Sequence, residues 1–303
     1  MASNVVGCGA KFPNFRWPDG ARVAISFCVH YEEGAERTPL ERDDNPEPDT
    51  SPIEGRGKQR NLGVESLYEY GPRRGIWRLL DIFDRTEIKV TFFCSGRALE
   101  QNSVAAREIT LRGHEACGHG YYWSPYYSMT RSEEKEDIEK AVRSIVSTTG
   151  QRPLGWHSRA PSEYTREHLV DLGFVYDSDS YDDDIPYYLD VKGQPFLTIP
   201  YAVDTNDDKF WPPPMVSGFS RPSNFFDVLK ETFDQLYVEG KTSPRMMSVG
   251  LHLRISGRPS RASQVMRFIQ YVKQHPNVWV ARRIDIARWW KSEQCGNVEE
   301  FNG

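Results

Sequence analysis

A short apolar run near the amino end of the chain places the strongest limit on how this sequence can fold. Residues 23–29, Val-Ala-Ile-Ser-Phe-Cys-Val, are too few for a helix of their own and predict a buried strand. The run leads into His30, Glu32 and Glu33, so an imidazole and two carboxylates lie at the rim of a core. Buried charges need partners, a metal ion or a shifted pKa. This strand end is therefore either a polar loop or the start of a functional site.

Beyond this strand, apolar residues alternate between strand-like and helix-like spacing. Such alternation predicts parallel strands joined by crossover helices, and about seven units favour a closed or nearly closed barrel over an open sheet. In barrels the chemistry gathers at the carboxyl ends of the strands. Thr130 and Glu133 predict a capping box at the start of one helix. The predicted strands are 88–94, 114–117, 154–156, 174–176, 196–199, 246–253 and 278–280, and the predicted helices are 76–83, 98–111, 130–146, 165–172, 225–236, 262–273 and 284–290.

One stretch interrupts this regular pattern. The chain has 303 residues, enough for one α/β domain with a sizeable core, and we expect a single domain over 1–303. Residues 34–74 are crowded with Pro, Gly and charged residues and show no period, so we expect a long loop insertion at about 34–74. Because it follows the acidic strand end directly, it is placed to wall or cover a site there.

Composition narrows the class of protein. A net charge of −5 with both signs abundant does not provide the basic patch of a nucleic-acid-binding protein. The five cysteines are scattered and form no CxxC pair, so a disulfide scaffold is not expected. The first residues lack the basic start and apolar core of a signal peptide, and no apolar run reaches the length of a membrane span. We therefore expect a cytoplasmic protein without a membrane partner, while export that needs no signal peptide stays open.

Residues that can bind a metal or move a proton concentrate at the predicted strand ends. Four of the seven histidines lie there, which is not expected of histidines scattered over surface and core. Alternation along a strand turns His30 and Glu32 to one face and Glu33 to the other. The polar residues at strand ends are His30, Glu32, Glu33, His119, His157, Arg159, Asp177, Asp179 and His252.

The chemistry of this set follows from its residue types. Neutral imidazole and carboxylate are ligands of hydrolytic zinc sites that keep one position open for water. Zinc-bound water is a nucleophile near neutral pH, and the ion also polarises a carbonyl. A separate histidine can protonate a departing amine, because its pKa lies near working pH. His30 and Glu32 are the better pair of inward ligands, and Glu33, in the turn, can still swing in as a base.

Six groups of motifs are spread along the chain, namely 31–34, 65–71, 113–115 with 119–123, 176–179, 199–201 with 204–207, and 250–252 with 257–259. Together they resemble the NodB-type polysaccharide deacetylase superfamily over nearly the whole chain. The closest subgroup holds metal-independent allantoinases and related peptidoglycan deacetylases. The resemblance implies a distorted (β/α)7 barrel, and it is less specific for the substrate, because function resides in the site and not in the fold.

Departures from the family pattern bear on the metal and the substrate. The superfamily's second metal motif has two histidines four residues apart, and here His119 matches the first while Trp123 stands at the second. That is the allantoinase-like pattern, and it puts a full metal site in doubt. His30, His157 and the Arg-Ala-Pro element that begins at Arg159 differ from the allantoinases and resemble the deacetylases. His30 can supply the ligand that Trp123 removes.

The resemblance favours metal-assisted removal of acetyl groups from N-acetylglucosamine units in chitin oligomers. Allantoinase activity, the hydrolytic opening of the allantoin ring, is the alternative, and a glycan-binding barrel without turnover is a third. The implied cofactor is Zn²⁺ or another divalent metal, the implied partner is an N-acetylated oligosaccharide or small amide, and a homo-oligomer is left open. The implied metal ligands are His30, Glu32 and His119, the catalytic residues are Glu33 and His252, and the substrate-binding residues are Trp123, Trp156, His157, Arg159 and Asp177.

Overall fold

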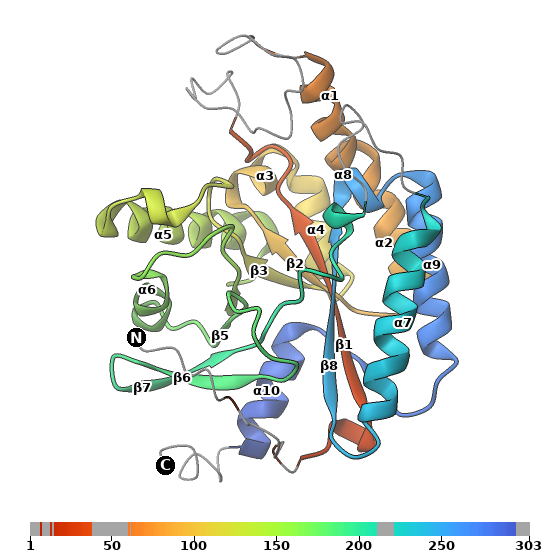
Figure 1. Ribbon diagram of the computed structural model, residues 1–303. Coiled ribbons are helices and arrows are strands. Elements are labelled where there is room, and N and C mark those ends of the chain that lie inside the picture. The colour runs from red at the N-terminus through yellow and green to blue at the C-terminus, as the bar shows by residue number, and fades with distance from the viewer. Residues whose placement is uncertain are drawn as a thin grey trace.

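The computed structural model describes residues 15–37, 62–210 and 221–294, together with Gly7, Pro13 and Arg60. A curved sheet forms the centre, and helices cover its outer face (Figure 1). The strands are β1 (Val23–Tyr31), β2 (Thr91–Cys94), β3 (Glu115–Gly118), β4 (Gly155–Trp156), β5 (Tyr176–Asp177), β6 (Tyr187–Val191), β7 (Gln194–Thr198), β8 (Arg245–His252) and β9 (Val278–Val280). The helices are α1 (Leu62–Tyr70), α2 (Ile76–Arg85), α3 (Gly96–Gln101), α4 (Ser103–Leu111), α5 (Arg131–Thr149), α6 (Thr165–Asp171), α7 (Ser223–Glu239), α8 (Leu253–Ser256), α9 (Pro259–Lys273) and α10 (Arg283–Gln294).

The sheet follows the order β6-β7-β5-β4-β3-β2-β1-β8, with β9 beside the first residues of β1. The neighbouring strands are parallel except in the β6–β7 hairpin. The segment after β7 completes the curve, because Asn206 forms a bridge with Gly250 of β8 and the Gly250 amide donates to the Thr205 carbonyl. Seven parallel strands, β1 to β5 with β7 and β8, therefore surround one interior, and the predicted distorted (β/α)7 barrel is confirmed.

Strand β1 explains how the barrel places its site. All nine of its residues are buried, as expected of a strand covered on both faces. Alternate side chains divide between two apolar clusters, so that Phe27 packs with the outer helices and Cys28 lies in the interior cluster. His30 shares the inward face with Cys28. The parallel register with β8 pairs His30 with His252, which brings two histidines together at the carboxyl end of the barrel.

A fully buried arginine ties the two ends of the sheet together. Arg283, the first residue of α10, donates through Nη1 to Ser178 Oγ at 3.0 Å and to the Ile199 carbonyl at 2.8 Å. Its Nη2 donates to the Pro200 carbonyl at 3.1 Å and to Ser248 Oγ in β8. One guanidinium thus satisfies polar groups from β8 and from the residues that follow β5 and β7. Such planar, multi-donor binding is specific to arginine.

Replacing this arginine should cost much of the stability. In Arg283→Met several buried oxygen acceptors lose their donor, and each unsatisfied group costs about 1–3 kcal/mol. We expect the free energy of unfolding, measured by urea titration, to fall by about 3 kcal/mol or more. Arg288→Met is the matched control, because Arg288 is exposed on the same helix, and it should change stability by no more than about 0.5 kcal/mol. Equal stability of the two variants would contradict the assignment.

The structure corrects part of the predicted insertion at about 34–74. Residues 62–75 are helical, since α1 continues through a π-helical turn, Gly71–Gly75, directly into α2. Pro72 and the two flanking glycines hid this helix from pattern analysis. The glycine is required by space, because a Cβ on Gly71 would lie 2.7 Å from Glu33 Cδ. Residues 38–59 and 61 of the predicted insertion lie outside the described residues.

Two further elements differ from the prediction, and one is confirmed. The predicted helix over 98–111 is split into α3 and α4 at Asn102, whose side chain caps α4 by accepting from the Ala105 amide. Strand β6 was not predicted, and it joins β7 through Lys192 and Gly193, both with positive φ, as tight hairpin turns require. The capping box of Thr130 and Glu133 is present at the start of α5.

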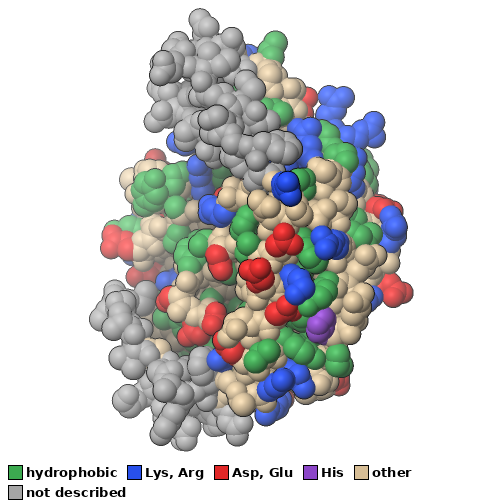
Figure 2. All heavy atoms as spheres, turned by 45° about the vertical axis from the view of Figure 1, so that its right-hand side comes forward, with side chains coloured by type: hydrophobic (Ala, Val, Ile, Leu, Met, Phe, Trp, Pro, Cys, Tyr) green, Lys and Arg blue, Asp and Glu red, His purple; other side chains and the backbone are tan. Residues whose placement is uncertain are grey.

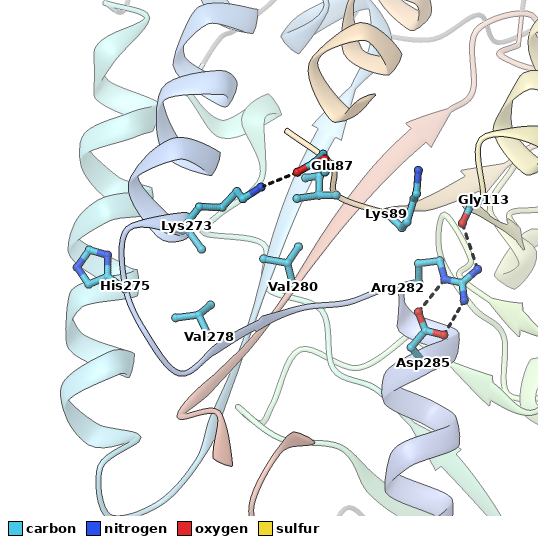
Figure 3. A pocket seen from close by; sticks show the side chains of 11 residues that line it. Glu87, Lys89, Gly113, Lys273, His275, Val278, Val280, Arg282 and Asp285 are labelled. Atoms are coloured by element: carbon cyan, nitrogen blue, oxygen red, sulfur yellow. Dashed lines mark hydrogen bonds and ion pairs between the residues drawn. The ribbon is translucent and has the colours of Figure 1, made fainter. Parts of the chain in front are cut away.

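A pocket of about 540 Å³ lies at the amino end of the sheet (Figure 3). It is lined by segments that precede β2, β3 and α10, by β9 and by the end of α9. Lys273 Nζ lies 3.9 Å from Glu87, and Arg282 pairs with Asp285 at 2.7 Å and donates to the Gly113 carbonyl. The predicted site residues lie at the opposite, carboxyl end of the strands.

The surface formed by α7 and α9 carries charged side chains of both signs, intermixed with apolar ones (Figure 2). Arg267 of α9 lies over the Phe226 ring of α7, 3.7 Å from its centre. Across the described ranges of the chain, none of the helices combines the length and the apolar character needed to cross a membrane.

Candidate active site

The carboxyl ends of four strands bring four imidazoles together around one carboxylate. His30 is the last residue but one of β1 and His252 ends β8, while His119 and His157 directly follow β3 and β4. Each of these histidines exposes 5% or less of its surface, and Glu32, one residue beyond β1, exposes 1%. The structure thus assembles the histidines and Glu32 that the sequence singled out at separate strand ends.

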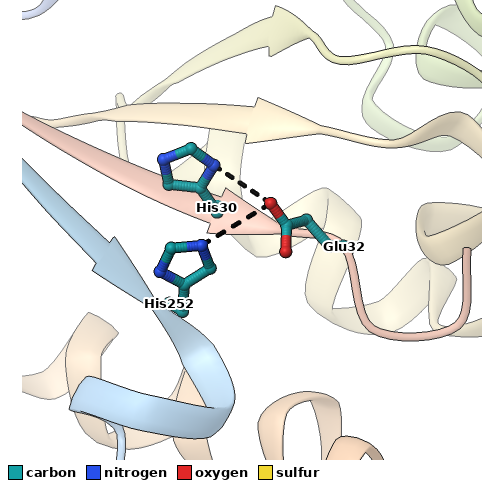
Figure 4. Close-up of side chains that lie close together, drawn as sticks. All are labelled: His30, Glu32 and His252. Atoms are coloured by element: carbon teal, nitrogen blue, oxygen red, sulfur yellow. Dashed lines mark ion pairs between the residues drawn. The ribbon is translucent and has the colours of Figure 1, made fainter. Parts of the chain in front are cut away.

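Glu32 is the centre of this group. Its Oε1 lies 3.2 Å from His30 Nδ1, 3.3 Å from His119 Nε2 and 3.6 Å from His252 Nε2 (Figure 4). Its Oε2 accepts a hydrogen bond from Arg254 Nη1 at 3.1 Å. Burial alone raises the pKa of Glu32, but His252 and the hydrogen bonds from the imidazoles lower the pKa well below its usual value. Glu32 is therefore ionised although water does not reach it.

His252 is held in its protonated form. Its Nδ1 donates to Asp207 Oδ1 at 2.6 Å, and its Nε2 faces Glu32. Asp207 is itself fixed, because it also accepts from the His252 backbone amide at 2.8 Å and from Ser256 Oγ at 2.6 Å. Burial lowers the pKa of His252, but the two carboxylates outweigh burial and raise the pKa to about 10. A buried imidazolium of this kind can deliver a proton to a departing amine.

His30 and His119 both turn a ring nitrogen toward Glu32. His119 Nδ1 donates to the carbonyl oxygen of His157, which can only accept, and His119 Nε2 faces Glu32 Oε1 at 3.3 Å. His30 Nδ1 is buried, faces the same oxygen and makes no hydrogen bond. Burial and the neighbouring His252 lower the pKa of His30 well below its usual value. Two ring nitrogens therefore converge on one carboxylate oxygen, an arrangement that can share a proton or hold a metal ion.

These donors fit a divalent metal. Donor atoms of His30, Glu32 and His252 lie within 4.8 Å of one another (Figure 4). The His30 and His252 rings are stacked, with centres 4.4 Å apart and planes 10° apart. Because His252 Nδ1 is bonded to Asp207, the residues that would hold the ion are His30, His119 and Glu32. Two imidazoles and one carboxylate form a common zinc ligand set.

Glu33 points away from the histidines, as strand alternation predicts. Its Oε1 accepts from the Arg254 backbone amide at 2.8 Å at the start of α8, and its Oε2 accepts from the Glu32 amide at 3.3 Å. Burial raises the pKa of Glu33, and Arg254 opposes this rise. In this arrangement Glu33 caps a helix and holds Arg254, and its predicted role as a base stays a prediction.

The predicted substrate-binding aromatic residues lie in different surroundings. Trp123 is half-buried, and the Arg159 guanidinium lies over its ring at 3.9 Å from the centre. Trp156 is completely buried in an apolar cluster with Phe174, and its Nε1 donates to Ser158 Oγ. Direct stacking of a substrate on Trp156 is therefore excluded in this arrangement, since the ring is core.

The remaining two predicted contacts support other groups. His157 Nδ1 lies 3.1 Å from Asp179 Oδ1, and its ring stacks on His119 with centres 5.2 Å apart. Asp177 binds Arg166 Nε at 2.7 Å, and burial raises the pKa of Asp177 to about 6 while Arg166 opposes the rise. His157 thus orients His119, and Asp177 belongs to a neighbouring ion pair.

Sequence reasoning assigned no role to three residues that contact the site. Tyr201 Oη lies 3.0 Å from His30 Nε2, Asp207 holds His252, and Arg254 holds Glu32. Tyr201 and Asp207 belong to the motif group 199–201 with 204–207, so the family resemblance could have assigned them to the site. Arg254 comes two residues after His252, but an arginine beyond a strand end is most often a solvated side chain.

A parallel barrel whose strand ends surround a buried carboxylate with imidazoles is typical of a hydrolase. The profile of the polysaccharide deacetylase family matches residues 57–175. A Schizosaccharomyces pombe protein whose name places it among the polysaccharide deacetylases is 33% identical over 302 residues, which cover 91% of this chain and 92% of that protein. The chain belongs to the polysaccharide deacetylase family, and it is a carbon–nitrogen amide hydrolase of that type.

Two solved structures are similar to this chain over nearly its whole length. A Pseudomonas aeruginosa PAO1 protein named for the polysaccharide deacetylases has 43% identity and a TM-score of 0.90, and the match covers 97% of this chain and 99% of that one. The allantoinase PuuE has 42% identity and a TM-score of 0.90, and the match covers 96% and 98%. Nearly equal similarity to both leaves the choice of substrate to the residues of the site.

Replacing His252 tests its role as the acid. His252→Asn keeps a polar group that can bond to Asp207 but cannot carry the proton, so turnover should fall about 10²–10⁴-fold. Turnover and the melting temperature are measured together. A folded variant that loses less than about tenfold would exclude His252 from this role.

Replacing Trp123 tests whether this position faces the metal site. Trp123→His restores the two-histidine spacing of the family and should bind Zn²⁺ at least about tenfold more tightly, as measured by calorimetry. Trp123→Phe is the control for loss of the indole alone and should leave zinc affinity unchanged. Equal affinity in both variants would show that position 123 does not face the ion.

Proposed function

We propose that this protein removes acetyl groups from N-acetylglucosamine units of chitin oligomers with the help of a divalent metal, most simply zinc. The observation that carries the proposal is His252, bonded to Asp207, next to a carboxylate that two further imidazoles face. Amide hydrolysis needs a proton donor for the departing amine and a cation for the carbonyl oxygen and the water. This arrangement supplies the first and has the ligands for the second.

In the proposed reaction, three residues would hold the metal and a fourth would act as the acid. His30, His119 and Glu32 would hold the metal, which polarises a carbonyl and makes its bound water nucleophilic near neutral pH. His252 carries the proton on Nε2, because Asp207 fixes Nδ1 as a donor. As the carbon–nitrogen bond breaks, that proton goes to the amine nitrogen, the hydroxyl of the attacking water stays on the acyl carbon, and the proton that the water loses restores His252, so the products are an amine and a carboxylic acid.

Substrate choice rests on the residues that distinguish the two subgroups. His30, His157 and Arg159 resemble the deacetylases, and each of them lies at the site or beside it: His30 contacts Glu32, His157 orients His119, and Arg159 covers Trp123. These positions support the deacetylase reading over the ring-opening one.

Allantoin hydrolysis is the second candidate. Two observations favour it, namely the 42% identity with the allantoinase PuuE over 96% of this chain and the tryptophan at position 123. The same acid serves both reactions, because allantoin opening also releases a nitrogen leaving group. The two candidates differ in substrate and in their need for metal.

A paired assay separates the candidates. Purified protein is given chitin oligomers, with acetate release as the readout, and allantoin, with substrate loss as the readout, before and after treatment with a chelator. Acetate release that chelation abolishes and zinc restores is the expected result. Allantoin turnover that survives chelation would overturn the proposal in favour of the second candidate.

Replacing His119 tests the ligand assignment without relying on activity. His119→Ala removes one of the two imidazoles proposed to hold the metal and should abolish binding of one equivalent of Zn²⁺, together with turnover. His168→Ala is the matched control, because His168 is a buried histidine of α6 and is not part of the site. Zinc binding that is equal in the wild type and in His119→Ala would remove this residue from the ligand set.

A further inference from the structure

Arg254 lies where the two acidic side chains of the strand end meet. Its Nη1 lies 3.1 Å from Glu32 Oε2 and 3.4 Å from Glu33 Oε1, and its backbone amide donates to the same Glu33 oxygen at 2.8 Å. The side chain exposes 14% of its surface. One arginine thus holds two consecutive carboxylates that would otherwise repel each other in a buried place.

Aromatic rings fix the guanidinium. It lies over Tyr68 of α1, 4.6 Å from the ring centre, and over Trp123, 5.7 Å from the ring centre. Arg159 lies over the same Trp123 ring at 3.9 Å. Cations over aromatic faces are stabilised by about 0.5–2 kcal/mol each. The helix α1, through Tyr68, and the loop after β3, through Trp123, therefore both contact Arg254, and Arg159 from the loop after β4 packs on the same Trp123 ring.

The two oxygens of Glu32 have different partners, and this is the basis of the inference. Oε1 faces the three histidines, whereas Oε2 faces Arg254. The last torsion of a glutamate is broad, so nothing within Glu32 itself fixes which way the carboxylate plane turns. A donor on Oε2 with a fixed position fixes the plane and so aims Oε1 at the histidines.

We propose that Arg254 is a positioning residue that orients the Glu32 carboxylate for hydrolysis, and that the rings of Tyr68 and Trp123 hold Arg254 in place. This inference rests on the proposed hydrolytic function. This orienting role depends on the planar, forked guanidinium and not on positive charge alone. A lysine ammonium cannot contact two carboxylates and two ring faces at the same time.

The first test separates geometry from charge. Arg254→Met and Arg254→Lys are compared with the wild type on the amide substrate that the paired assay identifies. Arg254→Met should lower kcat about 100-fold while KM stays within about threefold, because misplacement of a reacting group affects the chemical step. Arg254→Lys should remain at least about tenfold below the wild type. If Arg254→Met does not fold, Arg254→Lys makes the same comparison.

Chemical rescue separates positioning from a structural role, because an added cation restores kcat only if the lost guanidinium acts at the site. Guanidinium at about 20 mM, far below denaturing concentrations, should restore kcat of Arg254→Met at least about fivefold, whereas methylammonium should not. Arg267→Met is the matched control, since Arg267 packs over an aromatic ring far from the site, and its kcat should equal that of the wild type. Equal rescue by both cations, or a kcat of Arg254→Met within threefold of the wild type, would overturn the inference.

Crystal structures of the wild type and of Arg254→Met decide the point independently of activity. The Glu32 carboxylate should turn in the variant, so that Oε1 no longer faces the three histidines together. An unchanged carboxylate would overturn the role of Arg254 even if turnover fell. If the wild type hydrolyses neither substrate, the proposed function fails, and this comparison still tests Arg254.

Discussion

A single ionised carboxylate removed from water is the constraint on which the rest of this site depends. Moving a carboxylate into a protein interior costs several kcal/mol unless partners compensate. Glu32 exposes 1% of its surface, and its compensation comes from three imidazoles on one oxygen and a guanidinium on the other. Those partners come from three separate parts of the chain, around residues 30, 119 and 252–254, so the barrel must close before the charge is balanced. Folding and the ionisation of the site are therefore one event.

Closure of the barrel and preparation of the acid are also coupled. The segment after β7 bridges to β8 at Asn206 and Gly250, and the next residue along, Asp207, bonds to His252. The irregular stretch that completes the ring thus also supplies the carboxylate that keeps the imidazole protonated. Arg283 also connects these two parts of the sheet, because it donates to the Ile199 carbonyl after β7 and to Ser248 in β8. A substitution that disrupts the contacts between β8 and the segment after β7 would therefore lower the stability of the barrel and also displace Asp207 from His252.

Sequence reasoning predicted the features that depend on local order. The buried run of β1, the alternation of strands and helices, the capping box at Thr130 and the inward pairing of His30 with Glu32 all follow from spacing within a few residues. It did not predict Arg254, whose role depends on Tyr68 and Trp123, more than a hundred positions away in the chain. It also placed Trp156 against the substrate, because an aromatic residue in the core and one in a groove look alike in a sequence.

The glycine at position 71 shows how far the demands of the site extend into the scaffold. A methyl group there would lie 2.7 Å from Glu33 Cδ, well inside normal contact distance. Glu33 in turn bonds to the amide of Arg254. At the junction between α1 and α2, the backbone of Gly71 therefore packs directly against the side chain of Glu33. Gly75, at the other end of the junction, has the same limit, because a Cβ there would overlap the Leu253 carbonyl oxygen, so reshaping this helix to admit larger substrates would have to leave both glycines in place.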